Sequence, residues 1–348
     1  MYNKLRSLIF KLDPEFAHNL ALKALKINYF PQKKIEFNDS ISTKICGKKI
    51  PNPIGMAAGF DKNAEVYNEL FNLGFGFVEV GTITPKSQFG NSKPRVFRLE
   101  EDQALINRLG FNNSGAEKIH SRILSNSPKG LLGINIGPNK ESKNRIEDYI
   151  VCLRKFHDIA DYITINISSP NTENLRNFHE ENELDLLLNT IQNEKQSIKS
   201  KVPIAVKVSP DIKENKIELI SDILIKNNIE LVIISNTTDK NRDNLININK
   251  LEKGGLSGKP LERMSNKLIN KFYKLLKNKI KIIGVGGVDD GKSAFEKIVS
   301  GASFIQLYTG MVFQGPAIGQ KISNELINIL KIEGFKNISE AIGTKKST

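Results

Sequence analysis

Short apolar segments alternate with longer amphipathic segments along most of the chain from residue 54 onward. The apolar segments have the length of strands, and the segments between them repeat apolar positions with the period of helices. The pattern predicts eight strands, at residues 54–58, 77–81, 131–136, 162–167, 204–208, 231–235, 280–285 and 303–307. Eight successive β–α units predict a closed parallel (β/α)8 barrel, of the TIM-barrel class, rather than an open doubly wound sheet.

The N-terminal part of the chain does not share this alternation. Asp13 and Pro14 predict a helix N-cap and a first helical position, and apolar residues then follow one helical face to about Ile27. Together with residues 2–12, this predicts two short helices. We therefore expect an N-terminal helical segment at residues 1–40 and a barrel domain at residues 41–340. The helices either pack on the barrel or also contact a membrane surface.

The longest stretch without a clear strand or helix pattern is residues 84–113, after the second predicted strand. Long loops inside compact domains are often lids or binding loops. We therefore expect this stretch to be a lid or a binding loop.

Polar side chains are predicted to point into the barrel at the ends of four consecutive strands. Side chains alternate across a strand, and the alternation turns Asn135, Asn166, Lys207 and Ser235 inward. Barrel interiors are normally filled by branched apolar side chains, and a buried ammonium without a partner is costly. A polar ligand at the C-terminal mouth would account for these residues. The alternative is that Lys207 only pairs with the inward-facing Glu79 and binds nothing.

Glycine-rich sequences follow the last three predicted strands: GGLSGKPL at 254–261, GVGGVDDG at 284–291 and QLYTG at 306–310. Barrels commonly hold a phosphate with the loops after strands seven and eight. Gly286 and Gly287 allow close approach of the backbone, and Thr309 offers a hydroxyl. Each sequence alone could be an ordinary turn, but together they predict a phosphate-bearing ligand. The G-x-G-x-x-G spacing of dinucleotide sites is absent from them.

Composition narrows the classes of function. The formal net charge of +13 raises nucleic-acid binding, but the lysines are spread along the whole chain without aromatic-rich basic clusters, so we expect no nucleic-acid partner. The two cysteines, Cys46 and Cys152, and the four scattered histidines lack metal-ligand spacing, which predicts no metal site and a reducing compartment. The sequence contains no apolar run of eighteen residues, so we expect no spanning helix.

A series of short motifs resembles the class 2, quinone-dependent dihydroorotate dehydrogenases. The resemblance covers nearly the whole chain in the right order. Its motifs are LDPEFAH (12–18), AAGFDKN (57–63), INRLGFNN (106–113), GINIG (133–137), NISSPNT (166–172), VKVSPD (206–211), SNTT (235–238), GGLSGKPL (254–261), IIGVGGV (282–288) and LYTG (307–310). As a set, these motifs are highly specific.

The resemblance implies an FMN-containing barrel that oxidises (S)-dihydroorotate to orotate, with a membrane quinone as electron acceptor, in pyrimidine (UMP) biosynthesis. It assigns the proton-abstracting base to Ser169. Flavin-binding positions are Ala58, Gly59, Lys62, Thr82, Asn135, Asn166, Lys207, Ser235, Gly258, Gly287, Tyr308 and Thr309. Substrate-binding positions are Lys62, Asn107, Arg108, Leu109, Gly110, Phe111, Asn166, Asn171, Asn236 and Thr237.

The chemistry of these residue types agrees with their implied roles. An inward Lys207 would favour negative charge on reduced flavin, and Lys62 would pair with the substrate carboxylate. A serine hydroxyl is a poor base and needs help, for which Thr172 is a candidate proton relay. Ser169 also separates classes, because the soluble class 1 enzymes carry cysteine there. Family members carry threonine at Ser235, and the serine keeps the hydroxyl but loses a methyl group.

The resemblance further implies a monomer held peripherally on the cytoplasmic face of the inner membrane by the N-terminal helices. Quinone would enter between those helices and the flavin, past His18 and Arg98. Two other interpretations remain at this point. An FMN barrel acting on another substrate would share the phosphate loops and Lys207, whereas a basic binding module would purify without flavin.

Overall fold

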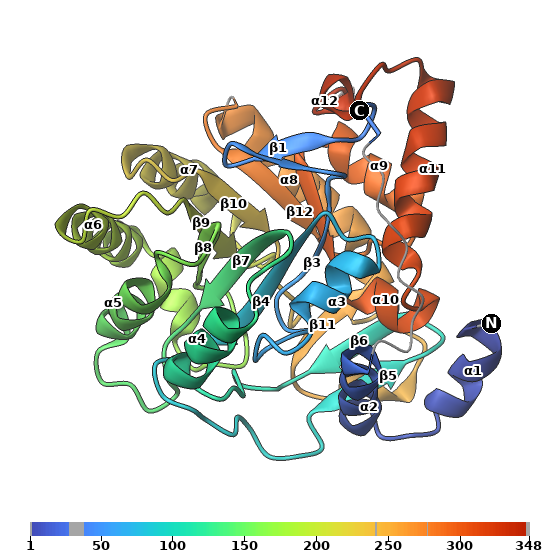
Figure 1. The fold of residues 1–348 in the computed structure, drawn as a ribbon, viewed down its shortest axis with the longest axis horizontal. Helices are drawn as coiled ribbons and strands as arrows, with labels where there is room; N and C mark the ends of the chain where they lie inside the picture. The colour runs from blue at the N-terminus through green and yellow to red at the C-terminus, as the bar shows by residue number, and fades with distance from the viewer. Residues whose placement is uncertain (1, 28–37, 241, 277, 346–348) are drawn as a thin grey trace.

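The eight predicted strands form a closed parallel barrel (Figure 1). The computed structural model describes residues 2–27, 38–240, 242–276 and 278–345, so residues 1 and 28–37 of the predicted N-terminal segment lie outside the described residues. The barrel strands are β3 (Ile54–Met56), β4 (Phe77–Ile83), β7 (Leu131–Ile136), β8 (Tyr162–Asn166), β9 (Ile204–Val208), β10 (Leu231–Ile234), β12 (Lys281–Val285) and β13 (Phe304–Leu307). The fold class predicted from the alternation of segments is confirmed.

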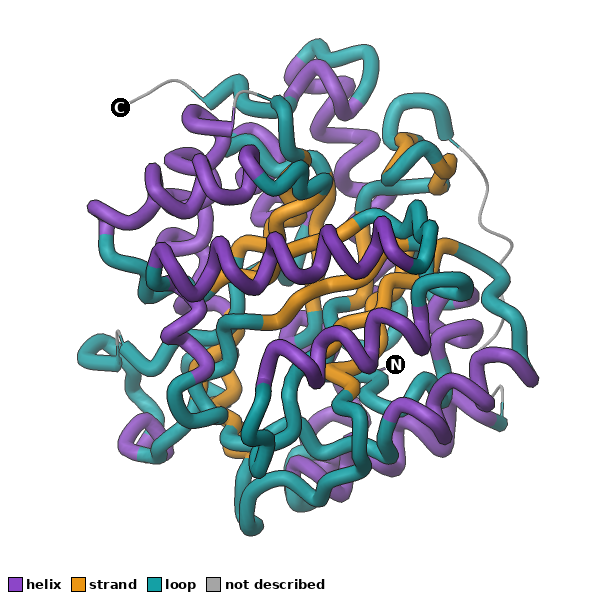
Figure 2. Tube along the Cα trace, turned by 90° about the vertical axis from the view of Figure 1, so that its left-hand side faces the viewer, coloured by secondary structure: helices purple, strands orange, loops and turns teal. Residues whose placement is uncertain are grey.

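Helices cover the outside of the barrel (Figure 2). They are α3 (Tyr67–Asn72), α4 (Ala116–Ser125), α5 (Arg145–Phe156), α6 (Glu181–Ser197), α7 (Ile217–Lys226), α8 (Glu262–Leu276), α9 (Gly291–Val299), α10 (Thr309–Gln314), α11 (Ile318–Glu333) and α12 (Ile338–Ala341). Local chemistry fixes where several begin. Helix α9 starts with a capping box, in which the Asp290 carboxylate accepts from the Ser293 N–H and the Ser293 hydroxyl accepts from the Asp290 N–H.

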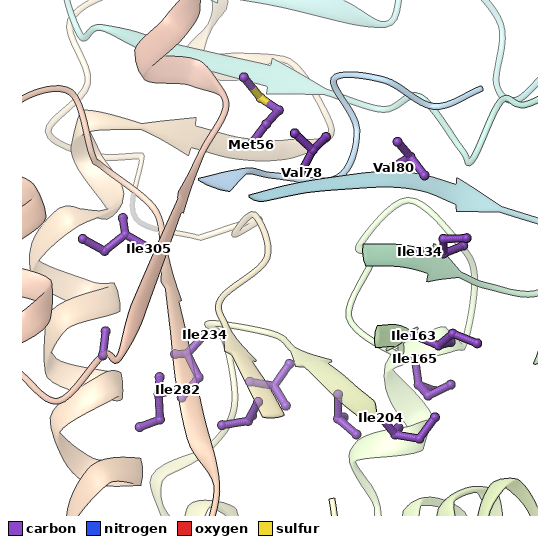
Figure 3. Close-up of a cluster of buried hydrophobic side chains, with 14 of the residues drawn as sticks. Met56, Val78, Val80, Ile134, Ile163, Ile165, Ile204, Ile234, Ile282 and Ile305 are labelled. Atoms are coloured by element: carbon purple, nitrogen blue, oxygen red, sulfur yellow. The ribbon is translucent and has the colours of Figure 1, made fainter. Parts of the chain in front are cut away.

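The hydrophobic core has two layers because the strands are buried on both faces. Outward-facing residues such as Ile134, Ile163 and Ile165 pack between the strands and the helices (Figure 3). Inside the barrel, Phe77 and Tyr162 pack against Ile45 and Ile50 of a hairpin, β1 (Thr43–Ile45) and β2 (Lys48–Ile50). This hairpin closes the N-terminal end of the barrel and leaves the C-terminal mouth for a ligand.

The stretch 84–113 contains regular structure that the sequence pattern did not predict. Strands β5 (Val96–Leu99) and β6 (Ala104–Asn107) pair with β11 (Gly255–Gly258) in an antiparallel sheet of three strands. The expectation of an irregular stretch was wrong there, because each strand has only four residues and pairs partly with a segment far away in the sequence. The sheet contributes residues to the pocket at the barrel mouth, which agrees with the expectation of a lid or binding loop.

The two N-terminal helices are present as predicted. Helix α1 (Tyr2–Ile9) is followed by α2 (Pro14–Lys26), whose N-cap Asp13 accepts a hydrogen bond from the Phe16 N–H. Helix α2 lies beside β5, and α1 lies against α10 (Figure 1). Arg95 forms an ion pair with Glu15, with a nitrogen–oxygen distance of 2.6 Å. Much of their apolar surface stays exposed, which packing on the barrel alone does not explain.

Candidate active site

One pocket at the C-terminal mouth of the barrel brings together the residues predicted from separate motifs. It is lined by the ends of the barrel strands, by the glycine-rich loops and by the three-stranded sheet. Every predicted flavin-binding, substrate-binding and catalytic residue lines it except Asn135 and Arg108. Motifs spread from residue 57 to residue 310 therefore meet in one place.

A network of amide and hydroxyl groups forms the floor of the pocket. The Asn166 amide donates to Thr82 Oγ1 at 2.9 Å, and the Thr82 hydroxyl donates to Asn135 Oδ1 at 2.6 Å. The Asn135 amide donates to a carboxylate oxygen of Glu79 at 2.8 Å, which fixes the orientation of the amide because a carboxylate only accepts. Asn135 thus lies one layer below the pocket and orients the two side chains that line it.

Lys207 is buried and points into this pocket. Burial lowers the pKa of Lys207, and the Glu79 carboxylate opposes that shift. Glu79 instead accepts hydrogen bonds from Asn135, Tyr162 and Gln306. Among the described residues, no hydrogen bond or ion pair within 4 Å joins the Lys207 ammonium to a partner. The alternative of a simple internal ion pair with Glu79 is therefore not supported, and the ammonium stays available to a ligand.

Two further polar atoms inside the barrel are left without partners. Thr164 Oγ1 and Gln306 Oε1 are buried and have no hydrogen-bond partner among the described residues. Buried polar groups in folded proteins are nearly always hydrogen-bonded. Together with the unpartnered Lys207 ammonium, these two atoms indicate that the polar interior of the barrel binds a ligand as well as packing the strands.

The loop after β8 presents Ser169 to the pocket. Ser169 is only 6% exposed, and its Oγ accepts a hydrogen bond from the Asn171 N–H at 3.2 Å. A donor aimed at Oγ stabilises negative charge there, which helps a hydroxyl to act as a base. Among the hydrogen bonds of the described residues, none joins the hydroxyls of Ser169 and Thr172, so the relay through Thr172 gains no support.

Ion pairs and a buried histidine hold the far end of this loop. The Arg176 guanidinium lies 3.1 Å from carboxylate oxygens of both Asp211 and Asp239. The Ser209 N–H donates to His179 Nε2 at 3.2 Å, so Nδ1 carries the proton and donates to the Arg176 carbonyl at 2.9 Å. Burial lowers the pKa of His179 to about 4, which keeps the ring neutral near pH 7. The loop is thereby tied to the strand ends on either side.

Lys62 provides a second cation at the pocket. Its ammonium donates to the Gly59 carbonyl at 2.6 Å. Burial lowers the pKa of Lys62 to about 8, and the Glu15 carboxylate acts in the opposite direction. The preceding Asp61 is fully buried and caps the backbone by accepting from the N–H groups of Glu65 and Val66, both at 2.7 Å. This carboxylate anchors the turn that carries Lys62.

Glycines in left-handed backbone conformations line the opposite end of the pocket. Gly287 has a φ of +77°, and a Cβ there would lie 2.6 Å from the backbone of Glu262. Gly258 has a φ of +100°, and a Cβ there would lie 2.4 Å from the carbonyl oxygen of Gln103. Only glycine fits both positions without displacing backbone. The hydroxyl of Thr309 donates to Ser257 Oγ at 2.8 Å and is held at the same end.

The side of the pocket near the N-terminal helices is apolar and aromatic. Tyr308 lines the pocket and packs edge-on against Phe60, whose ring lies 5.1 Å from that of His18 on α2. Burial, followed by the nearby Lys62 charge, lowers the pKa of His18 to about 3, so this histidine is a neutral aromatic wall. Phe313 of α10 also lines the pocket and packs edge-on against Phe10.

Two predicted residues, Arg108 and Arg98, do not line the pocket and have other partners. Arg108 turns out of the pocket, where it forms an ion pair with Glu252 at 2.7 Å and stacks over the Phe97 ring. Arg98 donates to the carbonyls of Phe10 and Leu12 at 2.8 and 2.9 Å and so fastens the α1–α2 connection. The hydrogen bonds of the Arg98 guanidinium are therefore structural contacts with the α1–α2 connection.

Sequence reasoning missed part of the lining, namely Val96, Gln103, Leu105, Ser257 and Phe313. Most of these belong to the three-stranded sheet or its turn. The short apolar run at residues 104–106 was the available signal, but so few residues do not distinguish a strand from a loop.

Within the described ranges, no group of three or more histidine, cysteine or carboxylate residues could hold a metal ion. The helices of those ranges also include none that is long and apolar enough to cross a membrane.

The fold and the pocket define a parallel (β/α)8 barrel with a polar, cation-containing site at its C-terminal mouth. The chain belongs to the dihydroorotate dehydrogenase family, whose model matches residues 40–330. Members of this family are flavin-dependent oxidoreductases.

Individual relatives match over almost their whole length. The chain is 45% identical to the dihydroorotate dehydrogenase (quinone) of Bartonella tribocorum over 96% of this chain and 94% of that protein. It is 42% identical to the mitochondrial dihydroorotate dehydrogenase (quinone) of Mus musculus over 95% and 87%. A crystal structure of the ligand-free Eimeria tenella enzyme matches with a TM-score of 0.92 and 35% identity, covering 97% of this chain and 100% of that chain.

Proposed function

We propose that the chain oxidises (S)-dihydroorotate to orotate in UMP biosynthesis, with FMN as resident cofactor and a membrane quinone as electron acceptor. One observation carries the proposal: Ser169, Lys207 and several asparagines line a single pocket in a chain of the dihydroorotate dehydrogenase family. The asparagines are Asn107, Asn166, Asn171 and Asn236. A serine at the base position and the names of the quinone-dependent relatives both favour quinone as the acceptor.

The residues at the barrel mouth fit FMN. The glycine-lined end, with Gly258, Gly287 and Thr309, suits a phosphate, because loops after the last barrel strands would offer backbone N–H groups and a hydroxyl to it there. Lys207 would lie against the flavin ring, and the Thr82–Asn135–Asn166 network would meet the polar atoms of the ring. Ala58, Gly59, Lys62, Ser235 and Tyr308 complete the set that would hold the cofactor. Bound FMN would supply the hydride acceptor.

Ser169 is the base in this proposal. It takes a proton from one ring carbon of the substrate while a hydride leaves the neighbouring carbon. The hydroxyl passes its own proton to a water in the pocket as it takes the substrate proton, and the Asn171 N–H bonded to Ser169 Oγ stabilises the charge that develops during this exchange. Burial of the loop excludes bulk water, which strengthens this interaction.

Recognition of the substrate rests on the asparagines and on Lys62. Asn107, Asn171 and Asn236 offer paired donors and acceptors to the amide edges of a dihydropyrimidine. Thr237 and the backbone of residues 109–111 complete the enclosure. Lys62 pairs with the substrate carboxylate.

We expect the affinity for orotate to fall as the pH rises above about 8. Lys62 is cationic below its pKa of about 8 and loses its charge above it, so the ion pair with the carboxylate is present at low pH and lost at high pH. A charged hydrogen bond contributes roughly 1.5–3 kcal/mol, which corresponds to about 10- to 100-fold in affinity. Titrating the flavin absorbance with orotate from pH 6.5 to 9.5 measures this loss.

The Lys62→Met variant is the control for that titration. It should bind orotate weakly at every pH and show no step near pH 8. A wild-type affinity that does not change across the range would contradict the role of Lys62.

We expect the Lys207→Met variant to fold but to hold flavin at a lower midpoint potential. Removing a buried cation removes a desolvation cost from the apoprotein, so its unfolding temperature should not fall. The variant loses stabilisation of negative charge on the reduced cofactor, by roughly 1.4–3 kcal/mol, or about 30–60 mV for two electrons. Spectroelectrochemistry measures the potential, and an unchanged potential would show that Lys207 does not face the flavin.

The N-terminal helices would place the protein at the membrane. Exposed apolar side chains on α1 and α2 suit peripheral attachment, and the aromatic wall formed by His18, Phe60, Tyr308 and Phe313 connects them to the pocket. In this proposal quinone enters between these helices and the flavin. The protein works as a monomer on the cytoplasmic face of the inner membrane.

The overall reaction is tested by measuring orotate formation with different oxidants. A short-chain ubiquinone should be reduced in equal amount to the orotate formed, whereas NAD⁺ and fumarate should support no comparable turnover. Orotate formation that requires NAD⁺ or fumarate would overturn the quinone assignment.

A further inference from the structure

A surface segment far from the N-terminal helices in the sequence carries three strongly exposed apolar side chains. Ile246, Ile248 and Leu251 are 75%, 82% and 81% exposed. They lie between β10 and β11, in and just before a 3-10 turn, η3 (Ile248–Leu251). We call residues 246–251 the apolar segment. The proposed reaction uses none of these side chains.

Hydrogen bonds fix the backbone of the apolar segment. The Asp102 carboxylate accepts from the N–H groups of Ile246 and Asn247 at 2.9 and 3.0 Å. Asn247 caps the turn by accepting from the Asn249 N–H, and Arg242 donates to the Lys250 carbonyl at 3.1 Å. The exposed side chains are therefore carried by a loop whose backbone is held in place by hydrogen bonds.

The apolar segment and the N-terminal helices meet at one residue of β5. The Asn249 amide donates to the Arg98 carbonyl at 3.0 Å. The Arg98 guanidinium donates to the carbonyls of Phe10 and Leu12 in the α1–α2 connection. The apolar segment therefore flanks the same strand as the helices, whose exposed large apolar side chains are Leu5, Leu8, Leu12, Phe16, Leu20 and Ile27.

We propose that the apolar segment is a second membrane-contacting element, in which Ile246, Ile248 and Leu251 enter the headgroup region of an anionic bilayer beside α1 and α2. This inference rests on the peripheral membrane attachment in the proposed function and adds a contact outside the N-terminal helices. Two anchors that both contact β5 would restrain rotation of the barrel on the membrane. They would hold the aromatic side of the pocket toward the lipid, where a quinone resides.

The chemistry of the segment favours a lipid surface over a second copy of the chain. The three apolar tips are separated by Asn247, Asn249 and Lys250, as suits side chains that dip between headgroups. Lys250 and Lys253 are offset by Glu101, Asp102 and Glu252 around the segment, so its contact rests on the apolar side chains, whereas exposed Lys11 in the α1–α2 connection matches anionic lipid in charge. A stable protein interface needs a contiguous buried patch of about 800 Å² on each partner, which three separated side chains do not supply.

The test uses the full-length, flavin-loaded protein and a triple variant, Ile246→Ser, Ile248→Ser and Leu251→Ser. Co-sedimentation with vesicles of phosphatidylglycerol and phosphatidylcholine should show about tenfold weaker binding by the variant. Turnover with long-chain quinone in those vesicles should fall in parallel, and turnover with a short-chain quinone in solution should not change. The matched control is Ile332→Ser, which removes a side chain that is 81% exposed at the end of α11, remote from α1 and α2 (Figure 1).

A helix variant, Leu5→Ser with Leu8→Ser, separates this inference from the proposed function. If that variant loses vesicle binding and the triple variant keeps it, the second contact is wrong and the attachment by the helices stands. If wild-type protein does not bind the vesicles at all, the membrane attachment itself fails. If the triple mutation converts a dimer to a monomer in solution without vesicles, a second copy covers the segment and the inference is overturned.

Discussion

Replacing Ser169 by alanine should slow the reduction of bound flavin by dihydroorotate by about 10²- to 10⁴-fold, the usual contribution of a positioned general base. The variant loses the only proposed proton acceptor in the pocket. It should retain FMN, because the Ser169 hydroxyl accepts its hydrogen bond from the loop backbone and not from the phosphate end. Anaerobic stopped-flow measurement at the flavin absorbance gives the rate directly.

The neighbouring Ser168→Ala variant is the matched control for this measurement. Ser168 is fully buried, and its hydroxyl donates to Asn166 Oδ1 at 3.0 Å and accepts from the Asn236 amide at 2.9 Å. Its loss should weaken substrate binding more than the limiting reduction rate. If Ser169→Ala reduces flavin as fast as the wild type does, or if both variants behave alike, Ser169 is not the base.

Deleting residues 1–40 should abolish quinone reduction while dihydroorotate still reduces the flavin. The deletion removes α1, α2 and the His18 side of the aromatic wall, so no enclosed apolar path would connect the pocket to the membrane. The polar floor and the phosphate end contain no residue of this segment. Steady-state turnover with a quinone and single-turnover flavin reduction measure the two half-reactions separately.

A point variant covers the case in which the truncated protein does not fold. The deletion leaves Arg95 and Arg98 without the partners that Glu15, Phe10 and Leu12 provide. Phe10→Ala keeps these backbone contacts and removes the ring that packs edge-on against Phe313, which should raise the quinone KM by about 2- to 10-fold, since an aromatic pair contributes roughly 0.5–1.5 kcal/mol. Normal quinone turnover by both proteins would refute entry at this side.

Much of the fold could be predicted because its strands are buried on both faces. Such strands are short apolar runs between amphipathic helices, and that contrast located all eight barrel strands. The sheet β5–β6–β11 was missed because its pairing joins residues 104–107 to residues 255–258, across about half of the chain. Local pattern carries no information about such a partner.

The strand alternation also predicted part of the pocket from physical reasoning alone. It turned Asn135, Asn166, Lys207 and Ser235 inward, since inward positions recur at every second residue. In the structure the last three line the pocket, whereas Asn135 lies beneath it. It could not find Arg176 and His179, because their side-chain partners lie in the loops that follow other strands. Nor could it show that Arg108 turns toward Glu252, because the direction of a long side chain depends on its tertiary surroundings. The family resemblance supplied the roles of the site residues. Only the geometry of the structure separates the residues that line the pocket from those that hold them in place.

The most direct test of the central claim is to add dihydroorotate to the purified protein without oxygen and follow the visible flavin absorbance. We expect a yellow protein that bleaches as one equivalent of orotate forms per flavin. If the protein is yellow and keeps its colour, the assignment of a flavin-binding barrel stands, but dihydroorotate is not its substrate. A protein that stays colourless, even after FMN is supplied, would contradict the account.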